Sequence, residues 1–112
     1  MKATRGDVVL LDHPFSDASG SKVRPALVVQ ADAFNQTHSS VTICPITSDS
    51  VDAPLFRVTL PPGERTGLSV PSQVMVDKVV SVPRTAIVRT IGRCDATHLD
   101  LVDDALRLWL EL

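Results

Sequence analysis

Short apolar runs, separated by turn-forming residues about every ten positions, dominate the first 94 residues of the chain. The runs are rich in Val, Ile and Thr, residues that favour the pleated and half-buried surface of a sheet. The third run contains Pro45, which predicts that its strand lies at an edge or ends there, because proline cannot donate to a ladder. The pattern predicts seven strands, at residues 7–12, 25–30, 41–46, 56–60, 67–70, 73–82 and 86–93, and at most one helical turn at 33–35.

From Asp95 onward the period changes to that of a helix. Leu99, Val102, Leu106 and Trp109 recur at helical spacing, and Asp95 is well suited to be the N-cap. A helix this widely apolar indicates either a partner surface or complete packing against the core. A second apolar row on the same helix consists of Leu101, Ala105, Leu108 and Leu112.

Strands followed by a single helix predict the fold class. We expect a mainly β protein of the α+β class, with an SH3-like small barrel or a strongly bent antiparallel sheet covered by the C-terminal helix. At 112 residues, with no linker and no internal repeat, the chain is expected to form one domain over residues 1–112.

Composition narrows the class of protein. The contents of 44% hydrophobic and 21% charged residues are ordinary globular values and exclude disordered, collagenous and disulfide-scaffold chains. Cys44 and Cys94 have no Cys-x-x-Cys spacing and are expected to be buried thiols. Neither a signal peptide nor a run of about 18 apolar residues is present, so we expect a soluble cytoplasmic protein without a membrane partner.

The formal charge of −2 hides an asymmetry along the chain. Residues 95–112 carry five acidic residues against one arginine, a local charge of −4. Residues 1–94 carry ten basic and eight acidic residues, a local charge of +2. The chain therefore has no basic footprint over its whole length of the kind that marks many nucleic-acid binders.

Several common catalytic and cofactor motifs are absent from the sequence. The chain has no His-Glu-x-x-His, no phosphate-binding Gly-rich loop, no paired Cys/His ligand set and no Gly-x-Ser-x-Gly. We therefore expect neither a metal site nor a cofactor. The three histidines, His13, His38 and His98, stand alone in the sequence.

Two segments carry candidate chemistry. Arg24 precedes Pro25, which favours an extended backbone at Arg24, and a guanidinium held there suits bidentate binding of phosphate. The plainer alternative is a solvated arginine at a strand end. The second segment, 45–50, places Thr47, Ser48 and Ser50 after an apolar strand, where hydroxyls donate to an anion or cap a turn.

Together with the opening run Arg5-Gly6-Asp7-Val8-Val9, these segments resemble a known family. The chain is similar to the MazF/PemK-like (Kid) toxins of bacterial type II toxin–antitoxin modules. The resemblance is carried by an ordered set of motifs over nearly the whole chain: 5–9, Arg24-Pro25-Ala26-Leu27-Val28-Val29, Pro45-Ile46-Thr47-Ser48, and Gly67-Leu68 to Gln73 followed by Asp77-Lys78.

The resemblance implies a homodimeric, metal-independent endoribonuclease with a cognate antitoxin as partner. It implies cleavage of single-stranded RNA by the ribose 2′-hydroxyl, giving 2′,3′-cyclic phosphate and 5′-hydroxyl ends and stopping translation. By the same resemblance, the catalytic arginine and threonine fall on Arg24 and Thr47. The substrate-binding residues that it implies are Ser48, Gln73 and, in the loop before Arg24, Ser19, Gly20 and Lys22.

The sequence leaves two questions open. No residue is assigned as the general base, although His13 and His38 have suitable intrinsic pKa values. A different class of function, a non-catalytic binding module or a toxin that inhibits gyrase on the same fold, would not need Arg24 or Thr47. Its determinant would instead be the apolar C-terminal helix.

Overall fold

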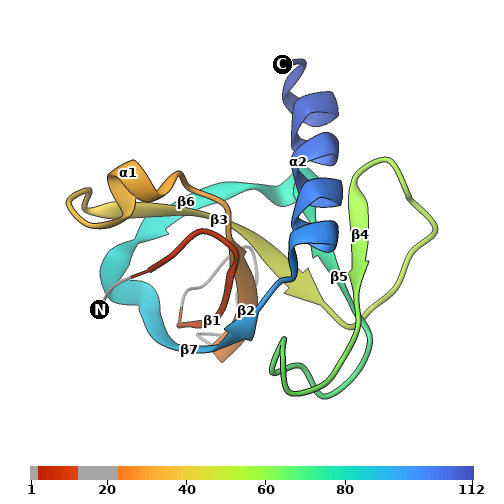
Figure 1. The fold of residues 1–112 in the computed structure, drawn as a ribbon, viewed down its shortest axis with the longest axis horizontal. Coiled ribbons are helices and arrows are strands. Elements are labelled where there is room, and N and C mark those ends of the chain that lie inside the picture. The colour runs from red at the N-terminus through yellow and green to blue at the C-terminus, as the bar shows by residue number, and fades with distance from the viewer. Residues whose placement is uncertain (1–2, 13–22) are drawn as a thin grey trace.

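The computed structural model describes residues 3–12 and 23–112 and shows a seven-stranded antiparallel sheet with one long helix packed against it (Figure 1). The strand order is β4-β5-β3-β2-β1-β7, and β6 pairs with β3. The predicted class, mainly β with a C-terminal helix, is confirmed. Within the described ranges no pairing joins the edge strands β4 and β7, so the sheet is strongly bent and open.

The elements are β1 (Asp7–Asp12), β2 (Val23–Val28), α1 (Asp32–Asn35), β3 (Ser40–Thr47), β4 (Arg57–Leu60), β5 (Ser72–Met75), η1 (Val76–Lys78), β6 (Val80–Pro83), η2 (Arg84–Ala86), β7 (Ile87–Arg93) and α2 (Ala96–Leu110).

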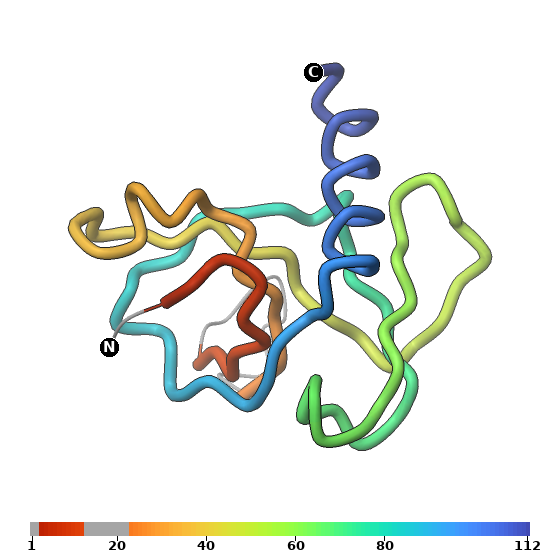
Figure 2. The backbone as a smooth tube through the Cα atoms, in the orientation of Figure 1, coloured from red at the N-terminus to blue at the C-terminus, as the bar shows by residue number. Residues whose placement is uncertain are grey.

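The bent sheet buries side chains on both of its faces. One face packs against α2 and forms the helix-side core, which includes Val8, Leu27, Cys44, Ile46, Val58, Leu60, Val74 and Val102. The other face lies inside the curl that the tube in Figure 2 shows, and forms the curl core of Val9, Leu11, Ala26, Val28, Val41, Ile43, Val82 and Ile87. Burial on both faces explains why β2 and the second half of β3 are apolar at successive positions rather than alternating.

The prediction that Pro45 places its strand at an edge or an end is wrong. β3 is the strand that connects the two halves of the sheet, with β2 on one side and β6 and then β5 on the other. The Thr42 carbonyl accepts from the N–H groups of Val29 and Gln30, which follow β2, so the backbone groups of Thr42 face that side. Because backbone groups alternate in direction along a strand, the Pro45 nitrogen points away from β2. On the side away from β2, the pairing of β3 with β6 extends as far as Ile43, and its pairing with β5 starts at Ile46. The missing donor therefore falls in the gap between two partner strands, where no ladder bond is lost.

Two predicted strands also differ in the structure. Residues 67–70 form no strand, because the chain from Pro61 closes on itself: the Gly63 N–H donates to the Leu68 carbonyl at 3.0 Å and the Thr66 hydroxyl donates to the Pro61 carbonyl at 2.9 Å. Gly67 has a φ of +74° and its backbone lies against the Ile91 carbonyl, which leaves no room for a side chain. The backbone groups are satisfied locally, so pairing with a neighbour is not needed.

The predicted strand 73–82 is divided into β5 and β6, which both pair with β3 along the same side. The turn η1 lies between them and shifts the register by three residues, since Ile46 pairs with Val74 whereas Ile43 pairs with Val80. In η1, Asp77 Oδ1 lies 3.4 Å from Arg57 Nε of β4. The corner that η1 makes is what turns β5 away from β6 and bends the sheet.

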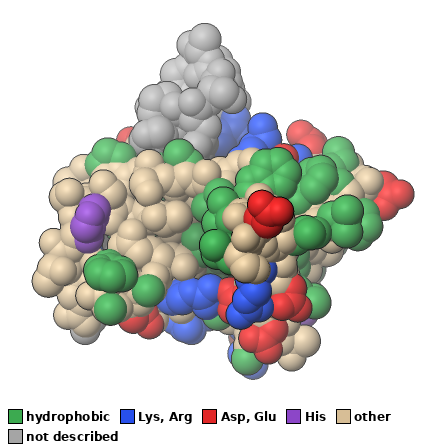
Figure 3. All heavy atoms as spheres, turned by 90° about the horizontal axis from the view of Figure 1, so that it is seen from above, with side chains coloured by type: hydrophobic (Ala, Val, Ile, Leu, Met, Phe, Trp, Pro, Cys, Tyr) green, Lys and Arg blue, Asp and Glu red, His purple; other side chains and the backbone are tan. Residues whose placement is uncertain are grey.

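Helix α2 begins as predicted. The Asp95 carboxylate accepts from the His98 backbone N–H at 2.8 Å and also contacts the His98 ring, which lowers the pKa of Asp95. Val102 and Ala105 are buried in the helix-side core. The leucines of the second apolar row, Leu101, Leu108 and Leu112, remain exposed, with Leu108 at 59% and Leu112 at 85%. Figure 3 shows apolar side chains gathered around the C-terminal end of the helix. Of the helices in the described ranges, none has the length and apolar character that a membrane span needs.

Candidate functional site

A row of polar side chains crosses the sheet where the curl core ends. Gln73 of β5 pairs directly with Thr47 of β3 on one side and with Thr59 of β4 on the other. The register of β2 against β3 runs from Val28↔Ile43 to Ala26↔Pro45, and two further steps place Arg24 opposite Thr47. Residues directly opposite in antiparallel strands share a face. Arg24, Thr47, Gln73 and Thr59 are therefore neighbours on one face, and we refer to them as the polar row.

Pro25 explains why the sheet opens at the polar row. In β2 the backbone groups of Leu27 point towards β3, so those of Pro25 do as well. Pro25 has no N–H to donate to Ile46, and the ladder between β2 and β3 ends at Ala26. Arg24 and Thr47 lie one step beyond Pro25 and Ile46, and their pairing with β1 and β5 holds their backbones in place.

Arg24 is exposed at this point, while Leu11, its partner on β1, is fully buried. The arginine is therefore anchored by a core strand at its backbone and has its guanidinium at the surface. A guanidinium is permanently charged and offers donors in a planar fork that matches two phosphate oxygens. Arg24 can bind a phosphate but is a poor proton acceptor.

The Thr47 hydroxyl is oriented by the segment that follows β3. Thr47 Oγ1 accepts a hydrogen bond from the Asp49 backbone N–H at 3.1 Å. A hydroxyl that accepts keeps its own proton for donation. Thr47 is half-buried and Ser48 beside it is exposed, so both hydroxyls are within reach of a ligand at the sheet end.

Gln73 is held more tightly than the other members of the row. Its side chain is engaged at both ends by the Val51 backbone, with Val51 N–H donating to Oε1 at 3.1 Å and Nε2 donating to the Val51 carbonyl at 3.0 Å. The residue is only 8% exposed. The sequence gives no signal for this contact, because it joins a side chain to a main chain 22 positions away.

The remaining sequence candidates do not join the polar row. His38 lies before β3, at the end opposite Thr47, about 23 Å away along a strand of this length. His98 belongs to the start of α2. Asp77, from the segment that follows Gln73, faces Arg57. His13 and the predicted substrate-binding residues Ser19, Gly20 and Lys22 lie outside the described residues.

In the part of the chain that the structure describes, no group of side chains is arranged for thiol or metal chemistry. Cys44 and Cys94 are buried and unpaired, as predicted. Burial raises the pKa of Cys44 to about 12 and that of Cys94 to about 11, so neither is a thiolate at neutral pH. Among the described residues, no three His, Cys, Asp or Glu side chains gather closely enough to hold a metal ion.

Comparison with known proteins places the chain in a family. The profile of the PemK-like, MazF-like toxins of type II toxin–antitoxin systems matches residues 4–110. A probable endoribonuclease MazF of Mycolicibacterium smegmatis is 43% identical over 89 residues, which span 80% of this chain and 81% of the relative. Endoribonuclease MazF9 of Mycobacterium tuberculosis is 32% identical over 114 residues, spanning 96% of each chain.

Solved structures show the same fold. MazF of Deinococcus radiodurans superposes with a TM-score of 0.82 at 27% identity, covering 100% of this chain and 99% of the other. A MazE–MazF structure from the same organism gives a TM-score of 0.81 at 26% identity, covering 100% and 98%. The chain belongs to the PemK-like, MazF-like toxin family of type II toxin–antitoxin systems.

Proposed function

We propose that the polar row is the catalytic site of an endoribonuclease toxin that cleaves single-stranded RNA without a metal ion. Endoribonuclease activity is the activity of the relatives to which the chain is similar over most of its length. The observation that supports the assignment of the site is the strand register: Thr47 pairs with Gln73, and the register of β2 against β3, continued two residues past its last pair, brings Arg24 opposite Thr47. A permanent cation and a hydroxyl donor on one face of a sheet end are the groups that a phosphodiester needs.

The reaction would proceed through the RNA's own nucleophile. The 2′-hydroxyl loses its proton and attacks phosphorus, the bond to the 5′-oxygen breaks, and that oxygen takes up a proton. The products are a 2′,3′-cyclic phosphate and a 5′-hydroxyl. The phosphorus passes through a pentacoordinate state that carries extra negative charge, which preorganised donors stabilise.

Arg24 and Thr47 take different roles in this scheme. Arg24 places its positive charge beside the non-bridging oxygens, and its high pKa suits stabilisation of charge rather than proton abstraction. The Thr47 hydroxyl donates a hydrogen bond to the same phosphate group and keeps its proton. Ser48 lies next to it at the surface, and together with Ser19, Gly20 and Lys22 it is proposed to contact the RNA on either side of the cleaved bond.

The outer face of α2 is proposed to bind a second copy of the chain. Leu101 and Leu108 are exposed and line a groove against the edge strand β4, together with Leu55. An exposed and continuous apolar surface of this kind is typical of an interface. Light scattering at micromolar concentration is expected to give twice the chain mass of 12.1 kDa, and a particle of the monomer mass would refute the dimer.

The partner in the cell is proposed to be an antitoxin protein with a flexible acidic segment that covers the polar row. The similarity to the MazF chain of a MazE–MazF complex supports a partner of this kind. The exposed charge of Arg24 offers an acidic segment the same contact that it offers a phosphate. Because its substrate is messenger RNA, the toxin would act in the cytoplasm.

The deciding experiment incubates the purified protein with a long single-stranded RNA in excess EDTA and identifies the ends of the fragments. Discrete cuts with 5′-hydroxyl ends are expected from the wild type. Arg24→Ala is expected to lose cleavage by about 10²–10³-fold while it keeps its fold and mass. Intact RNA after incubation with a folded wild-type protein would exclude the enzyme and favour a binding module, and wild-type rates in Arg24→Ala would remove Arg24 from the mechanism.

A further inference from the structure

We propose that Gln73 is a positioning residue that fixes the Thr47 hydroxyl by holding the segment Ser48–Ala53, rather than a residue that touches the RNA. This inference rests on the proposed function, because it concerns the rate of the same cleavage. Its starting point is the pair of hydrogen bonds between the Gln73 amide and the Val51 backbone, at 3.1 and 3.0 Å. Both ends of the amide are in use within the protein, and only 8% of the residue is exposed.

The segment Ser48–Ala53 is attached to the polar row at two points, and at its end the Ala53 carbonyl accepts from the Arg57 N–H of β4 at 2.9 Å. Near its start, the Asp49 N–H donates to Thr47 Oγ1 at 3.1 Å. Two residues later, Val51 is held by Gln73. Thr47 and Gln73 are themselves direct partners in the ladder between β3 and β5. The two attachment points are thus fixed relative to each other by the sheet, and the segment closes a short bridge between them.

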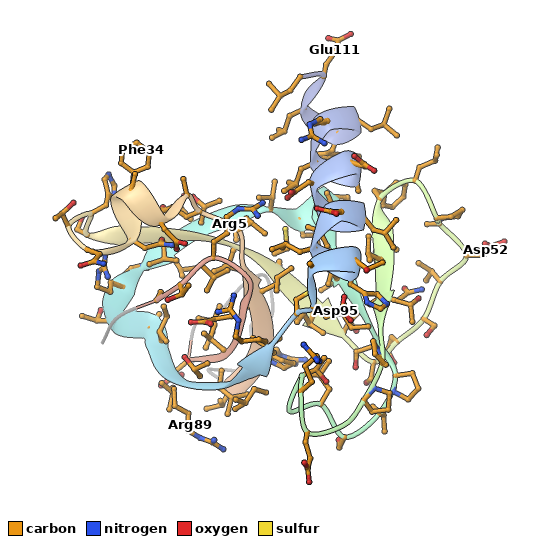
Figure 4. The ribbon with its side chains drawn as sticks, in the orientation of Figure 1. Arg5, Phe34, Asp52, Arg89, Asp95 and Glu111 are labelled. Atoms are coloured by element: carbon orange, nitrogen blue, oxygen red, sulfur yellow. The ribbon has the colours of Figure 1, made fainter. Side chains whose placement is uncertain are left out.

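This bridge determines the direction of the Thr47 hydroxyl. The Asp49 N–H occupies one lone pair of the oxygen, which leaves the proton to point elsewhere. If Val51 is released, Asp49 is no longer held over Thr47, and the hydroxyl is free to rotate. Figure 4 shows Asp52, in the far part of the segment, projecting away from the body of the molecule, and the side-chain bonds of Gln73 hold the segment immediately before it. A small misplacement of a catalytic group costs up to about 10²-fold in rate.

The chain offers a matched control at the other end of β3. Gln30 is also a glutamine whose side chain bonds to backbone, with Oε1 accepting from the Thr42 N–H at 3.1 Å and Nε2 donating to the Ser40 carbonyl at 3.2 Å. It is far from Thr47, and it holds β3 and, through Asn35 Oδ1 at 2.9 Å, helix α1, rather than a loop next to the site. Gln30→Leu and Gln73→Leu therefore both remove an amide that bonds to backbone, the first at a structural location and the second at the proposed positioning location.

The first test compares the kinetics of these two variants on a defined RNA oligonucleotide. Gln73→Leu is expected to lower kcat by about 10- to 100-fold with little change in KM, whereas Gln30→Leu is expected to keep kcat near the wild-type value. Amide hydrogen exchange at Val51 is expected to be about tenfold faster or more in Gln73→Leu, and this readout does not depend on activity. A raised KM with unchanged kcat in Gln73→Leu would show that Gln73 contacts the RNA, and equal losses of kcat in both variants would show a general loss of stability.

The second test uses Gln73→Glu, because a protonated carboxyl keeps both bonds and a carboxylate keeps only one. The neutral acid donates from its O–H to the Val51 carbonyl, but the ionised form presents two acceptors to it. The rate relative to wild type is expected to rise as pH falls through the pKa of the introduced acid. The charged groups on neighbouring elements, Asp49 and Asp52 of the segment and Arg24 of β2, are common to both proteins, so the ratio isolates the substituted position.

A flat ratio between pH 5 and 8 would overturn the inference. An inactive wild type would instead overturn the proposed function, and faster Val51 exchange in Gln73→Leu would still report the loss of the two bonds. An active wild type together with an unaffected Gln73→Leu would leave the proposed function standing and remove Gln73 from it.

Discussion

The two halves of β3 each contain one threonine, Thr42 and Thr47, but the strand has very different surroundings at its two ends. At its start, β3 has β2 on one side and β6 on the other, and the side chains of Gln30 and Arg84 bind the backbone groups that remain. At its end, the ladder to β2 has stopped at Pro25, and only β5 continues beside Thr47. The first end is closed by its own hydrogen bonds. The second end presents a cation and a hydroxyl that the paired strands behind them hold in place.

This difference indicates where a small β protein can place chemistry. A continuous ladder satisfies every backbone group and leaves little for a ligand. Where proline removes one donor, the strands stop pairing, and side chains beyond that point become available while the paired residues behind keep them rigid. Substitutions at the two ends of β3 and between them test this interpretation. Their expected effects decrease from Thr47 through Arg84 to Cys44.

Removal of the Thr47 hydroxyl is expected to have the largest effect. Thr47→Val keeps the shape of the side chain and loses the donor, so the cleavage rate is expected to fall about 100-fold with the melting temperature nearly unchanged. Thr42→Val at the other end removes the hydroxyl that meets Ser81 Oγ at 2.9 Å, and is expected to cost about 1 kcal/mol of stability without loss of rate. Thr47→Ser is expected to retain most of the activity. Equal rates in Thr47→Val and wild type would refute the role of the row.

Removal of the Arg84 side chain is expected to show the opposite behaviour. Its guanidinium donates to the carbonyls of Asn35 and His38 and so caps the end of α1. Arg84→Met is expected to lower the free energy of unfolding by about 1–2 kcal/mol and to leave the cleavage rate unchanged. The control is Arg89→Met, since Arg89 projects outward from β7 in Figure 4, and its effect is expected to stay within about 0.5 kcal/mol. Denaturant titration measures both, and a loss of rate in Arg84→Met would show that the two ends are coupled.

Cys44 lies between the two ends, and its effect is expected to be the smallest near neutral pH. Burial raises its pKa from 9.0 to about 12 in the folded protein. A group whose pKa is raised on folding contributes stability that is present below the unfolded value and is lost as pH rises towards the folded value. The free energy of unfolding is therefore expected to fall above pH 9, and less steeply in Cys44→Ala. Equal pH profiles for both proteins would show that the thiol has no part in this loss.

Local features of the sequence were enough to predict several elements of the fold. The strand at residues 7–12, the Asp95 N-cap and the helical period after it depend on neighbours within one turn or one strand, and their prediction is confirmed. The prediction failed where a distant contact decided the outcome. Residues 67–70 have a strand-like composition, but they close a loop on Gly63 and lie against β7.

The sequence by itself indicated which residues could carry the chemistry, since an arginine that precedes a proline and a threonine at a strand end offer a fixed cation and a hydroxyl. It also determined the mainly β class, because the period of apolar residues is a local property. Only the tertiary structure decided that Pro45 lies in a central strand and that Arg24, Thr47 and Gln73 share one row. The physical reason is that register and strand order depend on pairing between segments that are distant in the sequence, such as Ala26 with Pro45 and Ile46 with Val74, which no local pattern records.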